Sequence, residues 1–232
     1  MKINSNISCS STVIIFNKIL CVVSLLLLTI TVNAHSVYVE ADDNGNLIAR
    51  FGQFGDDPET SPGYLDNLDC LTAWTFSSQD SPKSLMPTKE HDHFNLNLLS
   101  ENGVEVQTGF PIMTRGTSPP RKPFFYARWL PNLSLTLKPS LTLDIVPSGE
   151  EGKMQVFFRN KPLPNIELTL YTPEGNEQTL ESDDSGFARF KCDEKGLFML
   201  KIGRYREERT GFDRGLLYQL VSHNCSVTWF ID

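Results

Sequence analysis

The sequence predicts an all-β protein made of two sandwich-like domains, and three observations support this fold class. Short segments of alternating apolar and polar residues recur throughout residues 35–232. Turn signals rich in Gly, Pro, Asn or Asp separate most of these segments. No part of residues 35–232 shows sustained helical periodicity. Short strands at this spacing are typical of a β-sandwich.

Residues 1–34 have the composition of an export signal. They contain Lys2, Lys18, no acidic residue, and an apolar run at 19–32 that is shorter than the roughly 20 residues of a membrane-spanning helix. Val32-Asn33-Ala34 places small residues where a signal peptidase reads them. We therefore expect a signal peptide at 1–34, cleaved after Ala34, with an uncleaved anchor as the alternative. The processed protein would be periplasmic or secreted and would not span a membrane.

Residues 35–146 are predicted to form an N-terminal β domain. A hairpin opens it, in which 36–40 and 47–51 flank an Asp-Asp-Asn-Gly turn. A polar loop follows at 55–66. The other strands expected here are 71–76, 93–98, 104–108 and 124–129, and the proline-rich segment 114–123 should be irregular.

Residues 147–232 are predicted to form a second sandwich domain after a turn at 147–152. The expected strands are 153–158, 166–171, 178–180, 187–190, 197–202 and 216–229. The mixed-charge run Arg204–Arg209 is expected to be a solvated loop or hairpin tip.

Charge and cysteine content limit the partners and the cross-links. Cleavage would remove Lys2 and Lys18 and change the formal net charge from −7 to −9. Nucleic acids and anionic lipids bind basic surfaces, so this charge argues against both. The three remaining cysteines are Cys70, Cys192 and Cys225. They permit one disulfide and one free thiol, and Cys192–Cys225 is one possible pair.

The position of His35 indicates a metal site. Cleavage after Ala34 would make His35 the first residue, and its α-amine and imidazole would then supply two nitrogen donors from one position. Such donors suit nickel, cobalt or copper, and also zinc. The alternative is that His35 is an arbitrary first residue.

The three other histidines are weaker candidate ligands. In an extended segment, His91 and His93 would project from one face, and we prefer His93 because it leads an apolar strand. A polar turn with solvated histidines is the alternative. His223 shares a face with Cys225 in its predicted strand, where it is either a structural histidine or part of a cluster with His35. The candidate metal ligands are thus His35, His93, His223 and His91.

The second half of the chain resembles a known module. The stretch from Asn160 through Thr172-Pro-Glu-Gly to Asp183-Asp-Ser-Gly-Phe-Ala-Arg-Phe190 is similar to the transthyretin-like sandwich of carboxypeptidase regulatory modules. Asn160 stands where glycine is usual. This resemblance implies a fold and almost nothing about function.

Residues 35–232 as a whole resemble an exported bacterial family grouped with periplasmic nickel-uptake accessory proteins. The matching features are Ala34-His35, Ser61-Pro-Gly-Tyr-Leu65, Asp92-His-Phe94, Leu143-Asp-Ile-Val-Pro147 and the late strand with His223. The chain departs from the pattern at His223-Asn-Cys. The resemblance implies a secreted metal-handling role with His35 as a ligand, and a membrane metal transporter as a partner.

No nucleophile elbow, zinc-protease helix or phosphate-binding loop occurs in the sequence. Three functions remain open. The favoured one is a non-catalytic metal-binding protein that captures nickel, cobalt or copper. The second is a copper-dependent oxidative enzyme that uses the terminal histidine. The third is a structural or adhesive sandwich in which the histidines are incidental.

Overall fold

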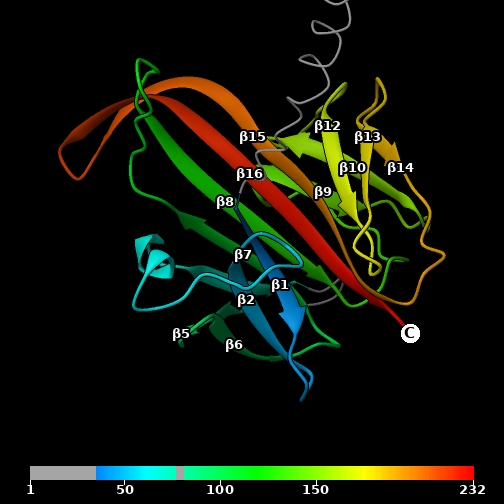
Figure 1. The fold of residues 1–232 in the computed structure, drawn as a ribbon. Coiled ribbons are helices and arrows are strands. Elements are labelled where there is room, and N and C mark those ends of the chain that lie inside the picture. Colours follow the sequence, from blue (N-terminus) through cyan, green and yellow to red (C-terminus); the bar gives the residue numbers. More distant parts are fainter. Residues whose placement is uncertain (1–34, 77–80) are drawn as a thin grey trace, which may run out of the picture. The chain divides into compact units, whose positions relative to one another are not determined.

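The computed structural model describes residues 35–76 and 81–232, which are mostly β-structure (Figure 1). The predicted signal peptide, residues 1–34, lies outside the described residues. One short 3₁₀ helix, η1 (Tyr64–Asn67), accompanies the strands. Among the described residues, no helix has the length and apolar character needed to cross a membrane. The predicted all-β class is confirmed.

The central element is an eight-stranded sheet, which we call the long sheet. In spatial order its strands are β13 (Glu177–Glu181), β12 (Glu167–Tyr171), β15 (Gly196–Asp213), β16 (Leu216–Ile231), β8 (Arg121–Leu130), β7 (Gly103–Gly109), β3 (Thr72–Phe76) and β4 (Ser84–Leu85). Neighbouring strands are antiparallel, except that β16 and β8 run parallel from Leu220 opposite Arg121 to Trp229 opposite Leu130. The strands of the predicted N-terminal and C-terminal parts therefore meet inside one sheet.

Two smaller sheets accompany the long sheet. The first small sheet has the order β1 (Ser36–Ala41), β2 (Asn46–Gly52), β6 (Phe94–Leu99) and β5 (Thr88–Lys89). The second small sheet is built around β10 (Lys153–Phe158), which pairs with β9 (Leu143–Pro147), β11 (Lys161–Pro162) and β14 (Phe187–Arg189).

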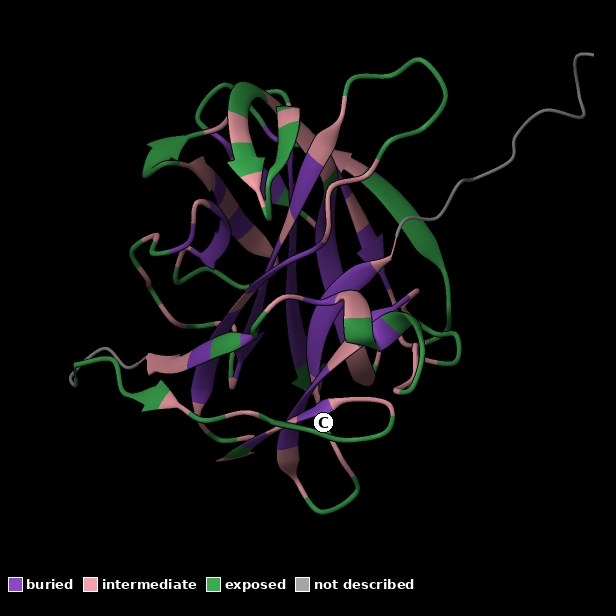
Figure 2. Ribbon diagram, turned by 90° about the vertical axis from the view of Figure 1, so that its left-hand side faces the viewer, coloured by how far each residue is buried: buried purple, intermediate pink, exposed green. Residues whose placement is uncertain are grey.

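The long sheet is buried on both faces, which creates two hydrophobic cores. On β8, Phe125, Ala127 and Trp129 pack in the core shared with the first small sheet. Tyr126 and Leu130 pack in the core shared with the second small sheet. Because successive side chains of a strand point to opposite faces, both kinds of position must be apolar, which explains the nearly continuous apolar run in β8. Figure 2 shows the buried central strands and the exposed turns around them.

Strand β1 lies across β16 and is held there by side-chain hydroxyl groups. Ser226 donates a hydrogen bond to the carbonyl of Val37 at 2.6 Å, and Thr228 donates one to the carbonyl of Val39. The first small sheet is therefore held against the face of the long sheet that carries Ser226 and Thr228.

The predicted boundary at residues 146/147 falls at the end of β9. It roughly separates the strands of the first core from most strands of the second. It does not separate two sheets, because β8 pairs with β16 over its whole length. The described residues, 35–76 and 81–232, form one compact unit.

Most predicted strands occur near their expected positions, and two segments differ. The run Arg204–Arg209, expected as a loop or tip, belongs to strand β15 and pairs with β16. Segment 121–123, expected to be irregular, forms the start of β8, where the carbonyl of Pro123 accepts a hydrogen bond from the backbone N–H of Phe110. Pairing with neighbouring strands outweighs local sequence preference in both places.

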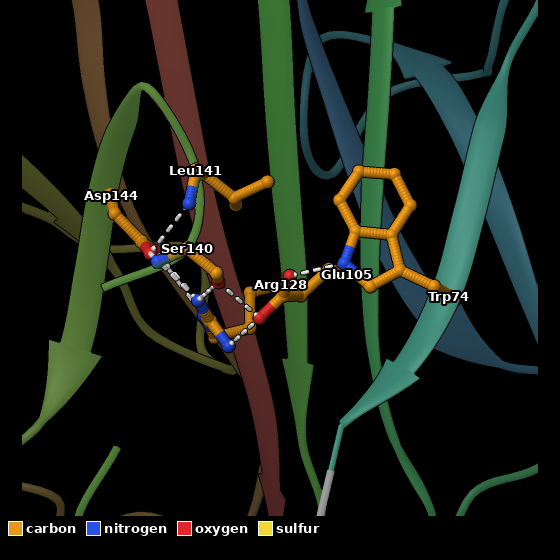
Figure 3. Close-up of polar contacts among 6 residues, drawn as sticks. All are labelled: Trp74, Glu105, Arg128, Ser140, Leu141 and Asp144. Carbon is orange, nitrogen blue, oxygen red and sulfur yellow. Dashed lines mark hydrogen bonds and ion pairs between the residues drawn. The ribbon is translucent and has the colours of Figure 1, made fainter. Parts of the chain in front are cut away.

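A buried ion network joins the long sheet to the second small sheet (Figure 3). Arg128 of β8 donates hydrogen bonds to Glu105 of β7 at 2.6 Å and to both carboxylate oxygens of Asp144 of β9, at 2.8 and 3.0 Å. All three residues are at most 3 % exposed. The Trp74 indole N–H and the Ser140 hydroxyl donate further hydrogen bonds to Glu105.

The network contains one cation and two carboxylates, and hydrogen bonds from the backbone complete it. Burial alone would lower the pKa of the Arg128 guanidinium, but the carboxylates of Asp144 and Glu105 outweigh burial and raise it. The backbone N–H groups of Ser140 and Leu141 donate to Asp144. These donors compensate for the second negative charge, so the buried groups are satisfied.

We predict that Arg128→Met destabilises the fold by about 3–5 kcal/mol, because it leaves two carboxylates buried without a cation. Denaturant-induced unfolding monitored by circular dichroism measures this change. Arg189→Met is the matched control, because Arg189 and Glu150 form an exposed ion pair whose loss should cost less than about 1 kcal/mol. Equal effects of the two substitutions would contradict the assigned role of Arg128.

Candidate functional site

The candidate site lies at the start of β1, where His35 meets Glu59. Nε2 of His35 is 2.5 Å from Oε1 of Glu59, and the two side chains are 40 % and 30 % exposed. A carboxylate oxygen is an acceptor, so Nε2 carries the hydrogen of this contact. In the neutral imidazole, Nδ1 then keeps its lone pair for another ligand.

Two aromatic rings fix the orientation of the His35 imidazole. The ring centroids of Phe51 and Tyr64 lie 5.4 and 5.5 Å from that of His35. Phe51 and Tyr64 are also stacked on each other, at 5.9 Å. The imidazole is thus positioned by a carboxylate and two aromatic side chains.

The backbone of β2 holds the loop that carries Glu59. The N–H of Glu59 donates to the carbonyl of Phe51 at 2.8 Å. The loop also lies directly on Gly52, where a Cβ atom would be 3.4 Å from Cα of Pro58 and 3.5 Å from N of Glu59. Gly52 is opposite Ser36 in the β1–β2 ladder, so Glu59 is placed next to the residue that follows His35.

The segment Ser61–Leu65 gives the loop its shape. A Cβ atom on Gly63 would be only 2.7 Å from the carbonyl oxygen of Thr60, so the turn requires glycine. Asp66 accepts hydrogen bonds from Lys89 and Ser61 at 2.8 Å and from the N–H of Gly63 at 3.0 Å. These bonds, the Lys89 bond foremost, lower the pKa of Asp66 to about 2. The motif noted in the sequence thus builds the loop beside His35.

His91 and His93 lie at the same end of the first small sheet, just before β6. Residues 91–93 form a bend, so the segment adopts the turn that was one of the two alternatives and not the extended arrangement. Nδ1 of His91 is 2.8 Å from the carbonyl oxygen of Ser61, and the N–H of Ser61 donates to the carbonyl of His91. His91 therefore contacts the loop that holds Glu59.

His93 is bonded to its own neighbour. Its Nδ1 is 2.7 Å from Oδ1 of Asp92, and Asp92 also accepts a hydrogen bond from Arg50 at 2.6 Å. The His93 bond comes first among the influences that lower the pKa of Asp92. The preferred ligand of the sequence analysis is thus tied to the Arg50–Asp92 pair and not to the loop beside His35.

The structure does not bring His223 to His35. His223 is 2 % exposed and packs against Phe158 of the second small sheet, with ring centroids 5.2 Å apart. The neighbouring residues Ser226 and Thr228 point to the other face, where they bind β1. The long sheet therefore separates the two histidines, and the predicted cluster of His35 with His223 does not form.

Both ring nitrogens of His223 have protein partners. Nδ1 is 3.0 Å from the hydroxyl of Tyr126, and Nε2 is 3.0 Å from Oε2 of Glu207. Glu207 is also paired with Arg159, at 2.7 Å. These contacts assign His223 a structural role, which was one of the two alternatives for it.

Within residues 35–76 and 81–232, no group of three or more His, Cys, Asp or Glu side chains is arranged to hold a metal ion. The three cysteines are free thiols, so the possible Cys192–Cys225 disulfide is absent. Burial raises the pKa of the Cys225 thiol well above its ordinary value. Burial likewise raises the pKa of Cys192, to about 11.

Glu59 lies in the polar loop predicted at 55–66, but it was not expected to be a partner of His35. Glu207 and Tyr126 were likewise not expected to be partners of His223. Nothing local in the sequence indicates these contacts. Comparison with protein-family models, curated proteins and solved structures gives no match for this chain.

We predict that His223 makes the stability of the fold decrease in mild acid. Burial of the imidazole lowers the pKa of His223, and its hydrogen bond to Glu207 offsets this effect only in part. The unfolded chain takes up the proton near pH 6.5 and the folded chain at a lower pH. The free energy of unfolding should therefore decrease as pH falls from about 7 towards 5.

Denaturant unfolding at a series of pH values measures this dependence. His223→Gln should flatten it in that range, because glutamine does not titrate. Glu207, whose pKa is lowered, acts in a different range: although burial raises its pKa, the bonds to His223 and Arg159 prevail. Its stabilising effect is lost below about pH 4.5. An identical slope in the original chain and in His223→Gln would contradict the prediction.

Proposed function

We propose that this protein is exported and that it captures a transition-metal ion, nickel, cobalt or copper, through His35 as its first residue. The observation that supports this proposal is the contact between Glu59 and Nε2 of His35. This contact leaves Nδ1 as a possible donor, and cleavage after Ala34 would add an α-amine on the same residue. Imidazole and amine nitrogens are suitable donors for these three metals, and zinc also accepts them.

The role of Glu59 follows from the way proteins prepare metal-binding histidines. A ligating histidine commonly donates its second ring N–H to a carboxylate, which fixes the tautomer and increases the basicity of the ligating nitrogen. Glu59 stands in that position, and its loop is held by β2. The residues present thus fit a metal ion bound by His35, with Glu59 as a positioning residue.

His35 would supply two donors, and the rest of the coordination shell would come from other groups. His91 and His93 each have one ring nitrogen bonded to an acceptor, so each neutral ring has its Nε2 lone pair available. Further positions could be filled by water or by a partner. A membrane metal transporter that receives the ion is the partner this function implies.

The decisive test compares two forms of the processed protein, one beginning with His35 and one keeping Ala34 ahead of it. Mass spectrometry first establishes the N-terminus of the exported chain. Calorimetric titration with Ni²⁺, Co²⁺ and Cu²⁺ then measures affinity. We expect the longer form to lose most of its affinity for these metal ions. In that form the backbone nitrogen of His35 belongs to a peptide bond and is not an amine. Equal affinities would remove the α-amine from the site and overturn the proposal.

Side-chain variants identify the supporting residues. Glu59→Gln should weaken binding by about 10–100-fold, because the ligating ring loses its carboxylate partner. His223→Gln is the matched control and should bind as the original chain does, because its imidazole lies on the opposite face of the long sheet. Loss of affinity in His223→Gln together with an unchanged Glu59→Gln would contradict the assignment. Consumption of oxygen by the copper-loaded protein with a reductant would favour the oxidative enzyme instead.

A further inference from the structure

The outer part of the β15–β16 hairpin is a two-stranded ribbon that extends past the other strands of the long sheet. Pairing of β15 with β12 is confined to Met199–Lys201. Pairing of β16 with β8 begins only at Leu220. Residues 211–218 thus pair only with each other in the ladders of the long sheet. In Figure 1 this ribbon projects to the left of the other strands.

The tip of this ribbon exposes large apolar side chains. Phe212 is 74 % exposed, Leu216 62 % and Leu217 43 %. They surround the turn at Arg214–Gly215, and Phe212 is directly opposite Leu217 in the ladder. Exposed apolar side chains that gather at a projecting tip indicate a surface that binds another molecule or a membrane.

Ion pairs hold the tip to the rest of the molecule. Lys122, which is buried, binds Asp213 and Asp69, both at 2.8 Å. Arg214 also pairs with Asp69. The tip is therefore held in place by ion pairs. Its apolar side chains are exposed on an ordered hairpin and not on a mobile loop.

A cluster of arginines lies at the base of the ribbon. Arg121 is opposite Leu220 at the start of β8, and Arg206 is opposite Ser222 in the β15–β16 ladder. Arg115 lies two residues after Met113, which bridges to Arg121. Burial of Arg121, and then the charges of Arg204, Arg206 and Arg115, lower the pKa of the Arg121 guanidinium. Within the described residues, none of these four arginines forms an ion pair with a carboxylate. Arg115 and Arg206 are exposed, and Arg209 adds another exposed cation nearer the tip.

The acidic side chains of the ribbon are mostly neutralised within the fold. Glu207 is bonded to Arg159 and His223, and Asp213 to Lys122. Glu208 remains as an exposed acid. The arginine cluster therefore concentrates positive charge at one place in a chain whose net charge is negative.

We propose that the tip of the β15–β16 hairpin docks on the surface of an anionic phospholipid bilayer. Phe212, Leu216 and Leu217 would enter the interface, and the arginine cluster would bind lipid phosphates. Apolar insertion combined with basic residues is how peripheral proteins hold to anionic membranes. The net charge of the whole chain argued against such a partner, but binding depends on the local charge around the docking residues.

The His35 site is oriented toward the ribbon. Ser226 bonds to Val37 and Thr228 to Val39, so β1 runs in the same direction as β16. His35 accordingly lies toward the half of β16 that leads to the ribbon. The lipid proposal does not depend on metal binding, because its residues are different.

The test uses the chain from His35 onward, which contains every described strand. The probe is vesicles of phosphatidylcholine and phosphatidylglycerol in equal parts, compared with vesicles of phosphatidylcholine alone. We expect co-sedimentation with the anionic vesicles only, decreasing as salt is added. The absence of binding to anionic vesicles would overturn the proposal and would leave a protein as the partner of the tip.

Variants separate the two contributions. Phe212→Ser with Leu216→Ser should reduce vesicle binding by about tenfold or more, because insertion of two apolar side chains is lost. Arg115→Gln with Arg206→Gln should reduce it roughly fivefold for each arginine. Met86→Ser, which removes an exposed apolar side chain elsewhere, and Arg189→Gln are matched controls and should bind normally.

A spectroscopic measurement reports insertion directly. Phe212→Trp places a fluorophore at the tip, and its emission should shift to shorter wavelength when anionic vesicles are added. Unfolding curves of each variant show whether the fold is intact. Unchanged binding by the tip variants, or no shift from Phe212→Trp, would show that the tip does not enter lipid.

Discussion

The fold depends on one buried interaction, in which Arg128 lies between Glu105 and Asp144. The three residues come from strands β8, β7 and β9, so the ion network ties the long sheet to the strand that begins the second small sheet. Removing Arg128 would leave both carboxylates buried without a cation. The three charged side chains can bond to one another only when β9 packs against β8. This requirement favours the observed packing of the two sheets.

The shared sheet also decides where the histidines lie. Hydroxyl groups on one face of β16 hold β1, whereas His223 and Cys225 occupy the other face. His35 therefore finds its partners among residues of the first small sheet and its loop. In the same sheet, the outer part of the β15–β16 hairpin extends past β12 and β8. Metal capture is thus proposed for the first small sheet, and lipid docking for the outer end of the long sheet.

Local features of this fold could be predicted from the sequence, and distant pairings could not. The first hairpin was predictable because Asp42 accepts hydrogen bonds from the N–H groups of Asn44 and Asn46, which makes the turn self-contained. The parallel pairing of β16 with β8 joins residues about one hundred positions apart, and no local pattern specifies it. Residues 124–129 were predicted as a strand, but nothing in that segment identified Arg128 as a buried charge or Glu105 and Asp144 as its partners. The contact of Glu59 with His35 likewise depends on how the loop folds back over Gly52.

The central claim is that the described residues form one cooperative unit. Both cores share the long sheet, and the Arg128 network joins this sheet to the second small sheet. Native-state hydrogen exchange in increasing denaturant tests this claim most directly. We predict that the slowest amides of β2, in the first small sheet, and of β10, in the second, exchange with the same opening free energy and the same denaturant dependence. Opening of one core at much lower free energy while the other stays protected would contradict the claim and would indicate two independent domains.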